Sequence, residues 1–188
     1  MTAEPASASN MQDDLREGAE RFDALYRDKA RAELADVFGA HCAVTWHGDV
    51  LAEVLLVKGE PGPEDVGAGF ALAGADGEAI TKALDALGAD GSRFALCSRA
   101  FDAPESGRYQ ALRRAVEAVD PSTVIALDGE AAADLATALG IEAIVYGTPI
   151  TVDGRTVLAV DGFERSLGDE TRKRAVWTQL RALSPKDS

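Results

Sequence analysis

The segment VLLVKGEPGPEDVGAGFALAG, residues 54–74, contains the side chains of this chain that are best suited to chemistry. An apolar run ends at Lys58, and the glycine- and proline-rich stretch that follows carries Glu60, Glu64 and Asp65. Carboxylates repel phosphate groups and stabilise positive charge that develops on a bound molecule. The stretch is therefore poorly suited to a phosphate.

Two specific sites can be compared with this stretch. A nucleotide site needs a glycine-rich loop followed by lysine and a hydroxyl residue, or three glycines in Rossmann spacing, and Gly67 and Gly69 supply only a fragment of the second pattern. A site for a planar ligand needs a ring such as Phe70, although an aromatic residue in a loop more often fills the core beneath it. A third alternative uses Asp65 and Asp161 as a magnesium pair.

Strands and helices alternate through the middle of the chain and would position these side chains. Apolar runs at residues 50–58, 93–99, 122–128 and 142–160 are separated by amphipathic stretches, and Asp153-Gly154 predicts a hairpin within the last run. This order predicts a three-layer αβα sandwich around a central, mainly parallel four-stranded sheet. Ligands of such sheets bind outside the carboxyl ends of the strands, where the segments after residues 58 and 99 and residues 161–165 should converge.

The length of 188 residues predicts a single domain over residues 11–183, with a disordered tail at 1–10 and a second tail at 184–188. The amphipathic helix that begins at Met11 is expected to pack on the sheet, and a partner surface is the alternative. The net charge of −13 disfavours general nucleic-acid affinity. The absence of a signal-like or membrane-spanning run and the presence of only two cysteines predict a cytoplasmic protein.

The order of these motifs resembles the uracil-DNA glycosylase superfamily of DNA repair, most closely its iron–sulfur-containing bacterial and archaeal class. That class has a Gly-Glu-Ala-Pro-Gly signature, then Glu-Asp, a glycine, Pro-Phe and Gly-x-Ala-Gly. The matching residues here are Gly59, Glu60, Pro61, Gly62, Glu64, Asp65, Gly67, Gly69, Phe70 and Ala73–Ala75. The run IALDGEAAADLATALG and the spacing of Lys173, Trp177 and Leu180 resemble later parts of the family. The resemblance implies a pocket for a flipped-out uracil, with Glu60 as the carboxylate near the water and sugar and Phe70 as the stacking ring.

The chain departs from this family at two catalytic positions. The asparagine that reads uracil is replaced by Cys97 or Ser98, and neither side chain offers a paired donor and acceptor. The catalytic histidine falls on Asp161 or Gly162, and an aspartate there would destabilise a developing anion. The histidines of this chain, His41 and His47, precede the first expected strand and are interpreted as surface or structural residues. The four cysteines that hold the family's cluster are missing, so no iron–sulfur cluster, other cofactor or metal is expected.

These observations predict a uracil-DNA glycosylase-like protein with a degenerate catalytic site and a binding role. The alternative is an active DNA base-excision glycosylase with altered base specificity. The expected partners are a protein and either DNA or a free base, and the DNA or base is expected to bind weakly. No contact with a membrane is expected. The basic clusters at Arg113-Arg114 and residues 171–174 are interpreted as solvated helix faces, and Trp177 as a core residue.

Overall fold

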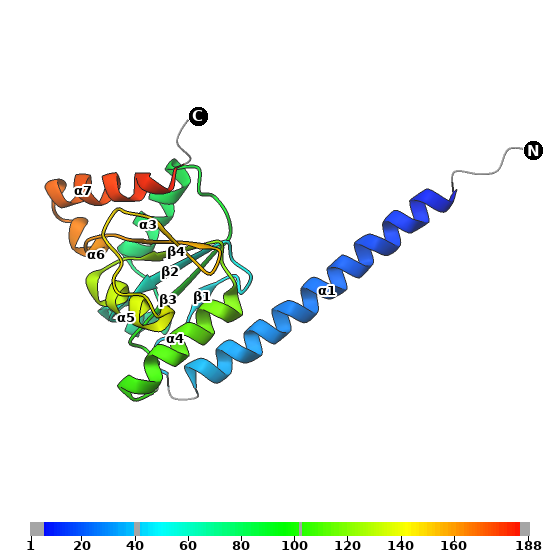
Figure 1. Cartoon of the computed structure of the whole chain (residues 1–188), viewed down its shortest axis with the longest axis horizontal. Helices are drawn as coiled ribbons and strands as arrows, with labels where there is room; N and C mark the ends of the chain where they lie inside the picture. Colours follow the sequence, from blue (N-terminus) through cyan, green and yellow to red (C-terminus); the bar gives the residue numbers. More distant parts are fainter. Residues whose placement is uncertain (1–5, 40–41, 102, 185–188) are drawn as a thin grey trace, which may run out of the picture.

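The computed structural model describes residues 6–39, 42–101 and 103–184, and a sheet of six strands lies at its centre (Figure 1). Its order is β1-β3-β2-β4-β6-β5. The strands are β1 (His47–Gly48), β2 (Val54–Lys58), β3 (Arg93–Cys97), β4 (Thr123–Ala126), β5 (Ile150–Val152) and β6 (Arg155–Ala159). The α/β class is confirmed. The sheet has six strands rather than the four expected, because short antiparallel strands β1 and β5 extend the four parallel ones.

Helices cover both faces of this sheet. On one face, α4, α5 and the end of α1 enclose one apolar cluster, and on the other α3, α6 and α7 enclose a second. The helices are α1 (Ala6–Phe38), α2 (Pro63–Ala68), α3 (Ala75–Ala86), α4 (Glu105–Val119), α5 (Gly129–Leu139), α6 (Phe163–Ser166) and α7 (Glu170–Leu180), followed by the 3-10 helix η1 (Arg181–Leu183). Trp177, expected in the core, is 37% exposed, because α7 packs through Val176 and Leu180 instead.

The strands are apolar along their whole length because both of their faces are covered. In β2 all five residues are buried. Leu55 and Val57 join the cluster under α4 and α5, whereas Val54 and Leu56 join the cluster under α3 and α7. This two-sided burial is typical of parallel strands between layers of helices.

The predicted hairpin is present between β5 and β6. Asp153 and Gly154 form its turn with φ angles of 49° and 81°, and such positive values at both central residues give the turn that suits a two-residue hairpin loop. The preceding run at residues 142–147, which was expected to begin the strand region, makes only an isolated bridge between Tyr146 and Ala159.

The N-terminal helix begins earlier than predicted. Residues 6–10 belong to α1, so the expected tail at 1–10 was wrong there, and residues 1–5 lie outside the described part of the chain. Helix α1 projects away from the domain (Figure 1), and Ala30, Leu34, Val37 and Phe38 near its end are buried. The prediction that this helix packs on the sheet therefore holds only for its last turns, which join the apolar cluster on one face of the sheet. Of the expected C-terminal tail, Ser184 is described and residues 185–188 lie outside the described part.

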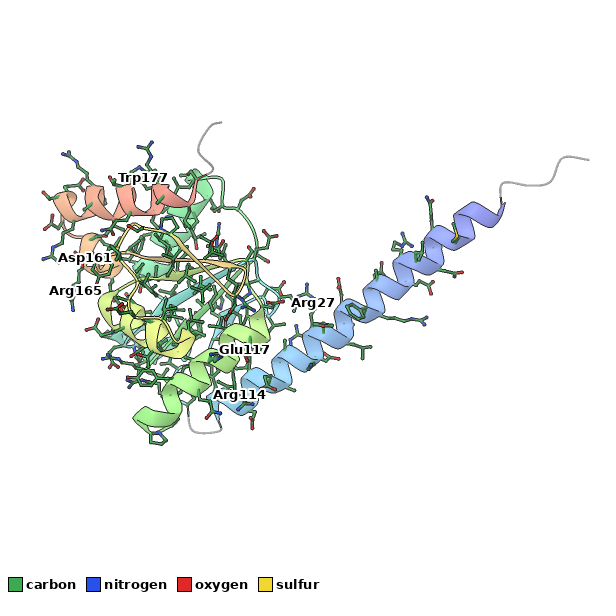
Figure 2. The ribbon with its side chains drawn as sticks, viewed as in Figure 1. Arg27, Arg114, Glu117, Asp161, Arg165 and Trp177 are labelled. Atoms are coloured by element: carbon green, nitrogen blue, oxygen red, sulfur yellow. The ribbon has the colours of Figure 1, made fainter. Side chains whose placement is uncertain are left out.

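Ion pairs attach the end of α1 to the domain. Arg27 pairs with Asp49, and Arg114 of α4 contacts Glu33 at 2.6 Å and Asp36 at 2.7 Å (Figure 2). None of the helices within the described residues has the length and apolar character to cross a membrane.

Candidate functional site

A pocket lies where the carboxyl ends of β2, β4 and β6 meet. Its volume is about 160 Å³, and we call it the Glu60 pocket. It is lined by Lys58, Glu60, Asp76, Leu127, Asp128, Glu130, Gly162, Phe163, Glu164 and Arg165. A second hollow, the Glu64 pocket, adjoins it and shares Lys58, Asp76 and Glu164; its other lining residues are Gly62, Pro63, Glu64 and Asp65. The stretch after β2 thus lines the edge of the sheet where we expected a ligand.

Lys58, the last residue of β2, lies between the two pockets and is almost fully buried. Its ammonium nitrogen lies 2.9 Å from Asp65 Oδ2, 2.8 Å from Asp76 Oδ2 and 2.9 Å from Glu164 Oε2. The side chains of Asp65 and Asp76 are also buried, whereas that of Glu164 is 57% exposed. One buried cation is therefore shared by three carboxylates.

Hydrogen bonds decide the charge states at this centre. Burial by itself would lower the pKa of Lys58, but hydrogen bonds to Asp76, Glu164 and Asp65 outweigh it and raise that pKa. Burial opposes ionisation of Asp65, yet the N–H groups of Ala73 and Gly62 and the ammonium of Lys58 lower its pKa. Both groups are therefore held in their charged forms, and Lys58 is not a neutral amine available as a nucleophile.

Asp128 connects β2 to the start of α5. It is the N-cap of that helix, where its Oδ1 accepts the Ala131 N–H at 2.7 Å, and its Oδ2 accepts the Gly59 N–H at 2.9 Å. Burial raises the pKa of Asp128 despite these two bonds. Glycine is required at position 59, where the chain after β2 passes the start of α5, because a Cβ atom on Gly59 would lie 2.6 Å from the Cβ of Glu130.

Glu60 lines the pocket named after it and faces solvent. Its side chain is 64% exposed, and Oε1 accepts a hydrogen bond from Arg99 Nη1 at 3.2 Å. The prediction that Glu60 follows the end of the strand and lines a crevice is confirmed by the lining residues.

Ser98 lies in a different polar cluster. Its hydroxyl donates to Asp134 Oδ2 at 2.7 Å, and both side chains are buried. Asp134 also contacts Arg99 Nε at 3.2 Å and Arg108 Nη2 at 3.5 Å. Ser98 lines neither the Glu60 pocket nor the Glu64 pocket.

Cys97 is buried at the end of β3. Burial, with the nearby charge of Asp65, raises the pKa of its thiol to about 12. The thiol is therefore protonated at neutral pH and suited neither to bind metal nor to act as a nucleophile.

Phe70 is separated from the pocket of Glu60. Its ring stacks on the imidazole of His47, with centroids 4.7 Å apart, and its backbone bridges to Thr45. Phe70 lines neither of the two pockets, because the chain after α2 returns to the edge of the sheet formed by β1. His47 is exposed, as expected of a surface residue, whereas His41 lies outside the described residues.

Asp161 (Figure 2) and Gly162 follow β6, and only one of them lines the Glu60 pocket. Gly162 lines the Glu60 pocket, whereas Asp161 is exposed, does not line it, and donates its backbone N–H to Gln179 Oε1 at 2.9 Å. Asp65 is bound to Lys58 and lines the Glu64 pocket, whereas Asp161 lines neither pocket, so the two aspartates of the alternative magnesium pair do not share a pocket. The described residues contain no group of three acidic, histidine or cysteine side chains placed to hold a metal ion.

The Glu60 pocket is lined by more acids than bases. Glu60, Asp76, Asp128, Glu130 and Glu164 line it, against Lys58 and Arg165, and Lys58 is paired within the protein. Ionised carboxylates only accept hydrogen bonds, so a ligand here must offer N–H or O–H donors or a positive charge. The volume is below the range of about 300–1,000 Å³ typical of drug-sized ligands, which restricts the site to about one ring.

Sequence reasoning missed Lys58 and Asp128. A lysine at the end of an otherwise apolar strand was a detectable signal, because lysine is rarely buried unless it is paired. The signal at Asp128 was its place before the expected helix at residues 129–139, where an aspartate is a favoured N-cap.

No known protein-family model matches the sequence, and no curated protein matches it either.

Proposed function

We propose that this chain is a uracil-DNA glycosylase-like protein whose catalytic site has degenerated and whose Glu60 pocket binds a single donor-rich heterocycle, such as a free nucleobase with an exocyclic amino group. The observation that carries the proposal is an acidic, ring-sized pocket that contains Glu60 and, among its lining residues, neither an asparagine nor a histidine.

The positions of the family's other groups support binding over excision. Ser98 is hydrogen-bonded to Asp134, Cys97 is buried, and Asp161 is not among the residues that line the pocket. Phe70 is stacked on His47 rather than placed to hold a base beside Glu60. Of the carboxylate, the amide, the histidine and the stacking ring, only a carboxylate lines this pocket. Losing one preorganised donor costs on the order of a hundred- to a thousandfold in rate.

The charge around the pocket disfavours DNA as the ligand. Five acidic side chains line it, and the whole chain carries a net charge of −13. Each phosphate contact must overcome this field, so DNA binding should be weak and strongly sensitive to salt. A free base carries no phosphate and can present its N–H groups to the carboxylates.

Calorimetric titration with free bases tests the proposal. We expect cytosine to bind more tightly than uracil, because its amino group can donate to the carboxylates. Glu60→Gln should weaken that binding about tenfold or more, as expected for a lost hydrogen bond to a charged group. The control Glu78→Gln removes an exposed carboxylate of α3 that does not line this pocket and should leave binding unchanged. Absence of binding by every base, or equal binding by the Glu60→Gln variant, would refute the proposal.

Asp128 supports a second candidate, an active glycosylase with altered base specificity. Its raised pKa, beside Glu60 in one pocket, is what a general acid paired with a carboxylate requires. Oligonucleotides carrying uracil, hypoxanthine or xanthine, assayed for abasic sites with the enzyme in catalytic amounts, separate the two candidates. Multiple turnovers that disappear in Glu60→Gln and Asp128→Asn would establish the enzyme and contradict the binding role.

A further inference from the structure

The projecting part of α1 carries an apolar stripe that the domain does not cover. Met11, Leu15, Phe22, Leu25 and Tyr26 are 51–69% exposed. Helix α1 extends away from the domain over this region (Figure 1). An unpartnered helix with so much apolar surface is marginal in water, because most helical stability in proteins comes from packing of an apolar face.

The spacing of the stripe suits a helical partner. Leu15, Phe22 and Lys29 recur every seven residues, and so do Met11, Gly18 and Leu25. These two interleaved series form the a and d positions of a heptad pattern, which defines a seam along one side of a helix. We infer that this stripe pairs with the same stripe of a second copy of the chain, in antiparallel orientation, and makes the protein a homodimer. This inference is independent of the function of the Glu60 pocket.

The stripe is complementary to itself when two copies run in opposite directions. With the two-fold axis near Glu20, Leu15 lies opposite Leu25 of the second copy, and Gly18 lies opposite Phe22. A Cβ added to Gly18 would have no atom within 4 Å, so the position is open to receive a large ring. A glycine weakens a helix interior, and close approach of a partner gives it a structural purpose.

Charge favours the antiparallel orientation. Residues 11–23 carry five acids and two bases, a net charge of −3, whereas residues 27–31 carry three bases and one acid, a net charge of +2. Parallel helices would place the acidic segment against itself. Antiparallel helices place it beside the basic segment of the partner, and complementary charge selects orientation in helical pairs.

A groove continues the stripe onto the domain. It has a volume of about 240 Å³ between α1 and α4, and Tyr26, Ala30, Arg114 and Ala118 are among its lining residues. In the antiparallel register, Met11 of the second copy lies opposite Lys29, which also lines this groove. The end of the partner helix therefore reaches a hollow large enough to accept its side chains.

The area is sufficient for a small specific interface. Covering the five exposed apolar side chains in both copies removes on the order of 1,000 Å² from water, which is the lower limit for a specific protein–protein contact. An interface of this size predicts a dimer that dissociates on dilution.

Light scattering coupled to size exclusion, over a range of protein concentrations, tests the dimer. We expect a mass of twice 19.7 kDa at high concentration. Phe22→Glu should give a monomer. Its domain should unfold at the same point as that of the wild type when unfolding is followed by circular dichroism, because the apolar core is unchanged. Ala24→Glu adds the same charge on the opposite side of α1 and should remain a dimer. A monomer at every concentration, or a dimer unaffected by Phe22→Glu, would overturn the inference.

Disulfide trapping tests the orientation. A mixture of Leu15→Cys and Leu25→Cys chains should form a cross-linked dimer on mild oxidation, and Leu15→Cys alone should not, since its two copies lie several turns apart. Wild-type protein gives the background from Cys42 and Cys97. Efficient cross-linking of Leu15→Cys alone would mean that the helices are parallel and would refute the antiparallel arrangement.

Discussion

The ammonium nitrogen of Lys58 lies 2.9 Å from Asp65 Oδ2, and the two side chains are only 7% and 1% exposed. This pair joins the end of β2 to the short helix α2. It holds the segment after β2 against the edge of the sheet, where that segment lines both pockets.

Removing the cation should destabilise the fold. Lys58→Met would leave Asp65 and Asp76 buried without their counter-charge, and breaking such a buried pair costs about 3–5 kcal/mol. Urea unfolding at neutral pH measures the loss. The control Lys82→Met breaks an exposed pair with Glu78 and should change stability by less than about 1 kcal/mol. Equal effects of the two substitutions would show that the buried pair is not important.

Asp65 should make stability depend on acid pH. Its pKa is lowered in the fold from an ordinary value of 3.8, so its contribution is fully present above that value and is lost as the pH falls through the lower folded pKa. Asp65→Asn should therefore be less stable than wild type at neutral pH, and the difference should shrink as the solution approaches pH 3. Unfolding curves across this range test the sign, and a difference that grows on acidification contradicts it.

The Ser98–Asp134 contact should be less important than the two arginines around Asp134. Ser98→Ala removes one hydrogen bond of 2.7 Å and should cost about 1 kcal/mol. Asp134→Ala also leaves Arg99 and Arg108 without this carboxylate and should cost about 3 kcal/mol or more. Chemical denaturation of both variants gives the ratio. A larger cost for Ser98→Ala would mean that the hydroxyl, rather than the charge, organises this cluster.

Cys97 should resist alkylation in the folded protein. Burial keeps its thiol pKa at about 12, so little thiolate forms at pH 8 and access is blocked as well. Peptide mapping after treatment with iodoacetamide should find Cys97 unmodified in native protein and modified in denaturant. Rapid modification of the native protein would show that the end of β3 opens to solvent.

Much of the fold was predictable because its signals are local. The apolar runs at the strands, the helix over residues 129–139 and the turn at Asp153-Gly154 depend on residues close in sequence. The same is true of the position of Glu60, which follows directly from where β2 ends. The edge strand β1 was not predicted, because it is two residues long and carries little periodicity.

By itself, the sequence determined the alternation of strands and helices, the edge of the sheet where carboxylates gather, and the acidic character of that edge. The tertiary structure alone decided which carboxylates share Lys58, because Glu164 reaches it from the far end of the chain. It also decided that Phe70 stacks on His47 and that the first turns of α1 leave the domain. An amphipathic pattern indicates that one face of a helix is buried, but it does not indicate which surface covers that face. Burial depends on all elements packed around a residue.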